Sequence, residues 1–148
     1  MRYTLLSLIG LSGLLANAAL AQQAKPNFSG TWKLDSGKSQ VHSGKPAVVS
    51  LAIEQKDSSI HVTRKMKAAD GTETTVEFTC TTDGQDCDGK SAGKVSFFFD
   101  GPALIEMDVS DDQISRTIMT LDDKQTVCAS VSYIFPKAES DALVFDKQ

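Results

Sequence analysis

The chain has 148 residues, with 15 Lys and Arg against 19 Asp and Glu, so its formal net charge is −4. This length allows one domain with a single sizeable core. Hydrophobic residues at 41% and charged residues at 23% argue against a collagen-like, coiled-coil or wholly disordered chain. The mildly acidic balance argues against nucleic-acid binding, which needs a basic surface to displace phosphate counterions.

The first 21 residues have the features of a secretory signal. Arg2 precedes an apolar stretch from Leu5 to Leu15, and Ala19-Leu20-Ala21 has the small residues that a signal peptidase recognises. The apolar stretch is shorter than the roughly 20 residues of a membrane span, and no second such stretch follows. We therefore predict a signal peptide at 1–21 and an exported β-barrel domain, periplasmic or secreted, at 22–148, with no transmembrane segment after cleavage.

Export would place the three cysteines in an oxidising compartment. A two-residue turn at Asp83-Gly84 would set Cys80 opposite Cys87 on neighbouring strands, at a spacing that suits a disulfide. Cys128 is then a free thiol or forms an intermolecular bridge. A competing interpretation pairs Cys128 with one of the other two.

Beyond the signal, apolar and polar residues alternate with the two-residue period of β-strands, and no long window has a helical period. Residues paired across a hairpin must point to the same face, so the turn lengths can be tested against this alternation. Mutually consistent turns are expected at 55–58, 69–71, 83–84, 100–102, 111–112, 122–123 and 136–141. The pattern predicts an all-β protein, an antiparallel up-and-down meander of eight to ten short strands that closes into a barrel and so has no exposed edges.

A barrel of this size holds either one small ligand or only its own side chains. In the expected register, Arg64 and Arg116 point inward, and a buried charge is costly unless paired, so they indicate a ligand carboxylate or phosphate. Tyr133 can donate a hydrogen bond to the same ligand. The expected ligand-binding set is completed by Met66, Met107 and Phe97. In the alternative interpretation the arginines reach solvent at the barrel rim, or one of them stacks on Trp32 as structure.

The inward column Gly89, Ser91 and Gly93 has almost no side-chain volume. Such a column either leaves room for a ligand or a gap in the wall, or marks a bend where a long strand turns a barrel corner.

The strand Asn27–Leu34, NFSGTWKL, resembles the first strand of the calycins, the superfamily of lipocalins and fatty-acid-binding proteins, whose signature there is Gly-x-Trp. Gly30 and Trp32 occupy those positions. The mature length also resembles small uncharacterised exported bacterial proteins that open with NFSGTWKL and end near Phe-x-Lys-Gln, here Phe145 to Gln148. The resemblance implies a calycin-like barrel in which Gly30 and Trp32 are structural.

Three features depart from the calycin pattern. Lipocalins stack a late basic residue on the first-strand Trp, but no Arg follows Arg116, so Arg116 or a lysine would take that role. Val131 stands two residues before Tyr133, so the late Arg-x-Tyr of the fatty-acid-binding proteins is absent. The stretch 35–47, DSGKSQVHSGKPA, predicts a loop rather than a two-helix lid.

Catalytic, metal and cofactor sites are not predicted. His42 falls in the polar loop and His61 on an outward face, and neither is placed beside an activated Ser or Cys. Calcium-loop spacing fails around Asp83 to Gly89, and there is no zinc pattern. We expect a non-enzymatic binding protein for a small apolar or amphipathic ligand. The alternative is a protein-binding barrel such as a protease inhibitor, with the segment 22–28 entering the protease cleft.

Overall fold

The computed structural model describes residues 24–89, 93–122 and 125–148, so the signal peptide predicted at 1–21 lies outside the described residues. The described residues form eleven β-strands and no helix. The strands are β1 (Gly30–Leu34), β2 (Ala47–Lys56), β3 (Ser59–Lys67), β4 (Glu73–Thr81), β5 (Asp83–Asp86), β6 (Asp88–Gly89), β7 (Lys94–Asp100), β8 (Ala103–Val109), β9 (Ile114–Leu121), β10 (Thr126–Phe135) and β11 (Glu139–Lys147). The described part of the chain has no helix that is long and apolar enough to cross a membrane.

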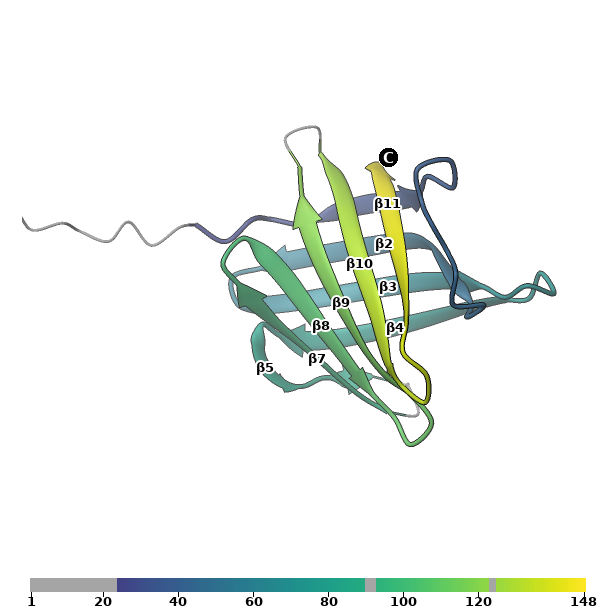
Figure 1. The fold of residues 1–148 in the computed structure, drawn as a ribbon. Coiled ribbons are helices and arrows are strands. Elements are labelled where there is room, and N and C mark those ends of the chain that lie inside the picture. Colours follow the sequence, from purple (N-terminus) through teal and green to yellow (C-terminus); the bar gives the residue numbers. More distant parts are fainter. Residues whose placement is uncertain (1–23, 90–92, 123–124) are drawn as a thin grey trace, which may run out of the picture.

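All strand pairs are antiparallel, and the sheet order is β5-β7-β8-β9-β10-β11-β1-β2-β3-β4-β6. Because β11 pairs with β1, the sheet curls into a barrel whose front wall, β7 to β11, crosses the back wall, β1 to β4 (Figure 1). The barrel is nearly closed: at the seam between β4 and β7, the short β6 pairs along the edge of β4 and the short β5 pairs along the edge of β7. The all-β antiparallel meander and barrel predicted from the alternation are confirmed.

One end of the barrel is filled by a dense apolar core. Phe28, Trp32, Leu104, Val127 and Phe145 are all at most 1% exposed and pack together where the β7–β8 and β9–β10 turns lie. The indole Nε1 of Trp32 donates a 3.0 Å hydrogen bond to the carbonyl of Phe28, which satisfies the one polar atom of the buried ring. The segment before β1 therefore closes this end.

The structural role predicted for Gly30 and Trp32 fits their packing. The ammonium of Lys147 lies 5.5 Å from the centre of the Trp32 ring, so a lysine takes the place of the late basic residue expected over the first-strand Trp. Gly30 has φ +152°, and a Cβ there would lie 3.2 Å from the Lys147 side chain and 3.5 Å from the Trp32 ring. Glycine at this position lets the lysine and the indole meet.

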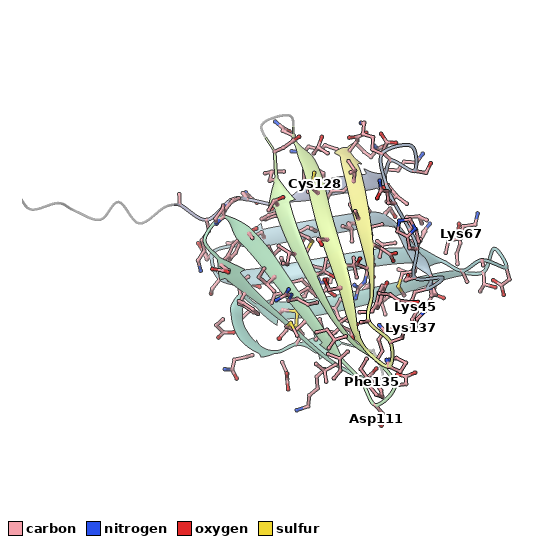
Figure 2. The ribbon with its side chains drawn as sticks, in the orientation of Figure 1. Lys45, Lys67, Asp111, Cys128, Phe135 and Lys137 are labelled. Carbon is pink, nitrogen blue, oxygen red and sulfur yellow. A yellow bond between two sulfur atoms is a disulfide. The ribbon has the colours of Figure 1, made fainter. Side chains whose placement is uncertain are left out.

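The disulfide between Cys80 and Cys87 is confirmed, with the two Cα atoms 4.5 Å apart. The tight hairpin predicted at Asp83-Gly84 is wrong, because residues 83–86 leave β4 and pair with β7, placing Asp83 opposite Phe98. This pairing satisfies the backbone groups at the edge of β7 that the seam would otherwise leave open. Cys128 is a free, exposed thiol on β10, far from the turn at Asp111 (Figure 2).

The β2–β3 turn is two residues shorter than expected and β11 begins inside the loop expected at 136–141, but neither difference changes an inward face. Two other turns differ from the expected length by an odd number of residues, and their effects on the inward face cancel. Asp100 pairs with Ala103, so the β7–β8 turn has two residues rather than the three expected at 100–102. Leu121 pairs with Val127, so the β9–β10 connection is longer than the two residues expected at 122–123. Each odd change in length reverses the inward face of the next strand. Strands β8 and β9 are therefore reversed relative to the expectation, while β10 and β11 are not.

Candidate ligand-binding site

The other end of the barrel holds a cavity of about 280 Å³. It opens where the β8–β9 and β10–β11 hairpins turn, near Asp111, Phe135 and Lys137 in Figure 2. A smaller space of about 30 Å³ continues inward beneath it, and both spaces touch Arg64. The cavity is lined by Val41, Lys45, Pro46, Ala47, Val48, Arg64, Met66, Val76, Phe78, Asp108, Gln113, Ser115, Thr117, Val131, Tyr133, Asp141 and Leu143.

An ion pair forms the floor of the cavity. Nη1 of Arg64 on β3 donates a 2.8 Å hydrogen bond to Oε1 of Glu106 on β8, and the two side chains are only 13% and 7% exposed. The guanidinium also lies 4.9 Å from the centre of the Phe78 ring. Nε of Arg64 is buried and has no hydrogen-bond partner. The protein thus leaves one enclosed donor of Arg64 unsatisfied beside the cavity, which is rare for a buried N–H group.

The cavity has a polar wall and an apolar wall. The polar wall consists of Asp108 on β8, Ser115 and Thr117 on β9, and Gln113 in the turn between these strands. The remaining walls are mainly apolar and include Val48, Met66, Val76, Phe78, Val131 and Leu143. Such a division suits a molecule with one polar edge and one apolar face.

A segment that we call the strap, residues 41–46, lies beside the mouth and is tied to β11 through Asp141. The buried carboxylate of Asp141 accepts hydrogen bonds from the backbone N–H of His42 at 2.6 Å and of Ser43 at 3.0 Å, and from the Ser43 hydroxyl at 2.6 Å. Just before the strap, Gln40 forms a β-bridge with Ala142. The loop expected at 35–47 is confirmed, since this stretch contains no helix.

The electrostatics of the cavity differ between its two aspartates. Burial raises the pKa of Asp108, and the negative charge of Glu106 raises it further, with Arg64 acting in the opposite direction. Burial would also raise the pKa of Asp141, but the hydrogen bonds from Ser43 and His42 outweigh that effect and hold the pKa below its usual value. Burial raises the pKa of the Tyr133 phenol, whose hydroxyl also interacts with Ser43 and Asp141.

The structure brings Arg64, Met66 and Tyr133 together around the cavity, as the sequence predicted. The inward orientation predicted for Arg116 and Met107 is wrong. They pair with each other as expected, but Arg116 is exposed and neither side chain lines this cavity or the smaller space beneath it, because β8 and β9 present the opposite face inward. Phe97 is inward but fully buried in the core rather than at the cavity.

The column predicted at Gly89, Ser91 and Gly93 is described only in part, since Ser91 lies outside the described residues. Gly93 stands against the end of β8, where a Cβ would lie 2.6 Å from the carbonyl oxygen of Val109. Close backbone approach explains glycine at this position.

Sequence reasoning missed three acidic residues of the site: Glu106, Asp108 and Asp141. The alternation assigned Glu106 and Asp108 to the solvent face, which is the usual place for carboxylates. The signal that could have found the first two is their alternation. Glu106 and Asp108 share one face of their strand, and Thr117 and Ser115 occupy the paired positions on the next strand. Asp141 falls in the loop expected at 136–141, so the alternation assigned it no inward or outward face.

No protein-family model matches this chain, and no curated protein matches it. It is similar in structure to the wild-type fluorescent protein UnaG, with a TM-score of 0.59 at 18% identity, covering 82% of this chain and 97% of that one. Two mutants of UnaG, in which an asparagine is replaced by alanine or by glutamine, match with TM-scores of 0.58 and 0.56 at 17% and 18% identity. They cover 82% and 81% of this chain and 96% and 95% of theirs.

At this level of identity the likeness shows the fold alone. That fold is an antiparallel β-barrel, the architecture implied by the resemblance of the Gly-x-Trp strand to the calycins.

Proposed function

We propose that this protein is an exported, non-catalytic carrier of a small amphipathic ligand, which it binds in the cavity at the open end of the barrel. The observation that carries the proposal is the contrast between the two ends. One end is packed with fully buried aromatic side chains, and the other holds a cavity of about 280 Å³ with an ion pair at its floor. A concave, mainly apolar space with a few fixed polar groups is typical of small-molecule sites.

The mouth of the cavity supports entry of a partly apolar molecule. Four large apolar side chains, Val41, Val109, Ile134 and Phe135, are at least 40% exposed, and all four lie at this end of the barrel. Exposed apolar side chains that gather at one place commonly mark an interaction site.

Export is supported by the signal-like residues 1–21 and by the disulfide, since disulfides persist in oxidising compartments. The small exported bacterial proteins that the chain resembles support the same assignment. We expect the intact mass of the exported protein to equal that of residues 22–148 with one disulfide. A protein that retains residues 1–21 would contradict export through signal cleavage.

The absence of catalysis is supported by the positions of the two histidines. His61 lies on the outer face with Nδ1 3.1 Å from Oγ1 of Thr79, and neither His61 nor His42 lines the cavity. The protease-inhibitor alternative is less well supported, because Phe28, the last residue of the segment expected to enter a protease, is completely buried.

The carrier function can be tested with 8-anilinonaphthalene-1-sulfonate, an amphipathic fluorescent anion. We expect saturable one-to-one binding, weakened at least about tenfold in Thr117→Phe, which fills the cavity. Thr120→Phe is the matched control, since Thr120 is exposed on the same strand and should leave binding unchanged.

The arginines provide a second matched pair. Arg64→Met should weaken binding of the anion by about tenfold, whereas Arg116→Met should leave it unchanged. Native mass spectrometry of protein from the exported fraction of its own host should show a co-purifying small molecule that is lost on denaturation. Equal binding by Thr117→Phe and the wild type would exclude the cavity as the site.

A further inference from the structure

The polar wall of the cavity follows two neighbouring strands from the mouth to the floor. On β8 and β9, Asp108 pairs with Ser115, and one step deeper Glu106 pairs with Thr117. The next inward step, Leu104 opposite Met119, is apolar and belongs to the core. Polar groups therefore line this wall over two consecutive inward pairs, rather than at one point.

Much of the hydrogen-bonding capacity along this wall is unused by the protein. Within the described residues, the carboxylate of Asp108 forms no hydrogen bond or ion pair, although it lies in the field of both Glu106 and Arg64. Nε of Arg64 is buried and unpaired. A buried donor without a partner and a half-buried carboxylate without one both cost folding free energy. The Arg64–Glu106 ion pair engages Nη1 of Arg64 and leaves both of these groups without a partner.

We propose that the ligand carries a hydrogen-bond donor for Asp108 and a hydrogen-bond acceptor for Arg64 along one edge, with its opposite face apolar. This inference rests on the proposed function and specifies the chemical class of the ligand. It describes a polyfunctional amphipathic molecule, such as an aromatic or polycyclic acid that also bears an amine, amide or hydroxyl group. A single-headed acyl chain would satisfy Arg64 and leave Asp108 facing methylene groups.

The size of the cavity agrees with a compact ligand. A volume of about 280 Å³ is at the lower end of the range for small-molecule sites. The apolar side chains of Met66, Val76 and Val131 would cover the face of the ligand that carries no polar group.

Two fluorescent probes that differ by one donor test the inference: 6-amino-2-naphthoate and 2-naphthoate. Both are anions at neutral pH, so the carboxylate for Arg64 is common to the pair and only the amine for Asp108 differs. We expect wild-type protein to bind the amino probe about tenfold more tightly, the usual effect of one hydrogen bond to a charged acceptor. Fluorescence titration gives both dissociation constants.

Variants of Asp108 test whether the preference for the amino probe depends on this carboxylate. Asp108→Val should reduce the preference for the amino probe to within about twofold, because the acceptor is gone while the cavity keeps its shape. Asp111→Val is the matched control, since Asp111 is exposed in the β8–β9 turn outside the cavity, and it should keep the full preference. Asp108→Asn, which retains the shape of the side chain, guards against misfolding and should reduce the preference in the same direction.

The possible failures are distinguishable. If wild-type protein binds both probes equally well, or if the preference survives in both Asp108 variants, the proposed ligand class is wrong while the carrier function stands. If neither this pair nor 8-anilinonaphthalene-1-sulfonate binds, both proposals are overturned.

Discussion

Arg64 and Glu106 lie on opposite walls of the barrel, on β3 and β8, and their side chains meet at 2.8 Å in its interior. They are 42 residues apart in the chain. This ion pair separates the packed end of the barrel from the cavity, and it is mostly shielded from solvent. Breaking a buried pair leaves one charge without compensation, whereas replacing both charges with apolar groups removes the cost altogether.

We therefore predict that Glu106→Leu destabilises the protein by about 3–5 kcal/mol, because it leaves the Arg64 guanidinium buried and unpaired. The double variant Arg64→Met/Glu106→Leu should recover most of this loss. Urea denaturation of the single and double variants measures both quantities. The control is the exposed pair Lys137–Glu139, where Lys137→Ala should change stability by less than about 1 kcal/mol. Additive losses in the double variant would argue against this account.

Trp32→Ala should lower the free energy of unfolding by about 3–5 kcal/mol, as truncation of core aromatic residues does. The ring is 1% exposed and its Nε1 is hydrogen-bonded to Phe28, so both packing and a polar contact are lost. Lys147→Ala removes the ammonium near the ring and its exposed 3.0 Å hydrogen bond to Oε1 of Gln125, and should cost no more than about 1 kcal/mol. Chemical denaturation followed by circular dichroism is the measurement, since Trp32 is the single tryptophan and its fluorescence is lost in the variant. A loss under about 1 kcal/mol for Trp32→Ala would contradict the role of Trp32 as a core residue.

The disulfide between Cys80 and Cys87 should contribute about 2–3 kcal/mol. It closes a short loop, with the two cysteines seven positions apart, and the chain-entropy model gives a value at the low end of the usual range for such loops. We expect this loss in the Cys80→Ser/Cys87→Ser variant. Cys128→Ser should be neutral, because Cys128 is exposed and free. Thiol titration of the folded, unreduced protein should detect one thiol, and three thiols would contradict the pairing.

The strap should loosen in acid. The folded-state pKa of Asp141 is lower than its unfolded value, so its carboxylate stabilises the fold above the unfolded pKa of about 4 and loses that contribution as the pH falls through the folded pKa. The stability difference between wild-type protein and Asp141→Asn should therefore be largest at neutral pH and shrink below pH 4. Hydrogen exchange at the amides of His42 and Ser43 should accelerate over the same range. A difference that is constant with pH would show that the carboxylate charge is not what holds the strap.

Asp108 should behave in the opposite way. Its folded-state pKa is higher than its unfolded value, so its ionisation destabilises the fold as the pH rises through that interval. Asp108→Asn should thus be more stable than wild-type protein at pH 7, and the gain should disappear below pH 4. Thermal unfolding at several pH values measures the trend. A neutral or destabilising effect of Asp108→Asn at pH 7 would mean that the carboxylate has a structural partner.

The sequence determined the class of fold because alternation and turn chemistry are local properties. The Ala69-Asp70-Gly71 turn shows this: Gly71 adopts φ +89°, and the backbone N–H of Ala68 donates to the carbonyl of Thr72 as a three-residue turn requires. The facing pair Cys80–Cys87 and the inward positions of Arg64, Met66 and Tyr133 followed from the same local rules. Arg64 and Met66 lie on β3, whose turn was assigned with the right parity. Tyr133 faces inward as expected because the two turn errors before β10 cancel, and Cys80 faces Cys87 because the register of β4 with β6 is the expected one although the tight turn is absent.

Only the tertiary structure decided which face of β8 and β9 lines the cavity. The turn at Gly101-Pro102 is one residue shorter than expected, and a change of one residue reverses every side chain of the next strand. This single residue explains why the inward face of β8 and β9 differs from the prediction. That face carries Glu106, Asp108, Ser115 and Thr117 instead of Met107 and Arg116. Alternation could not detect it, since a charged residue is ordinarily stable only in water and becomes stable inside when a partner on a distant strand, here Arg64, meets it. That meeting across the barrel depends on closure of the sheet, which no local pattern records.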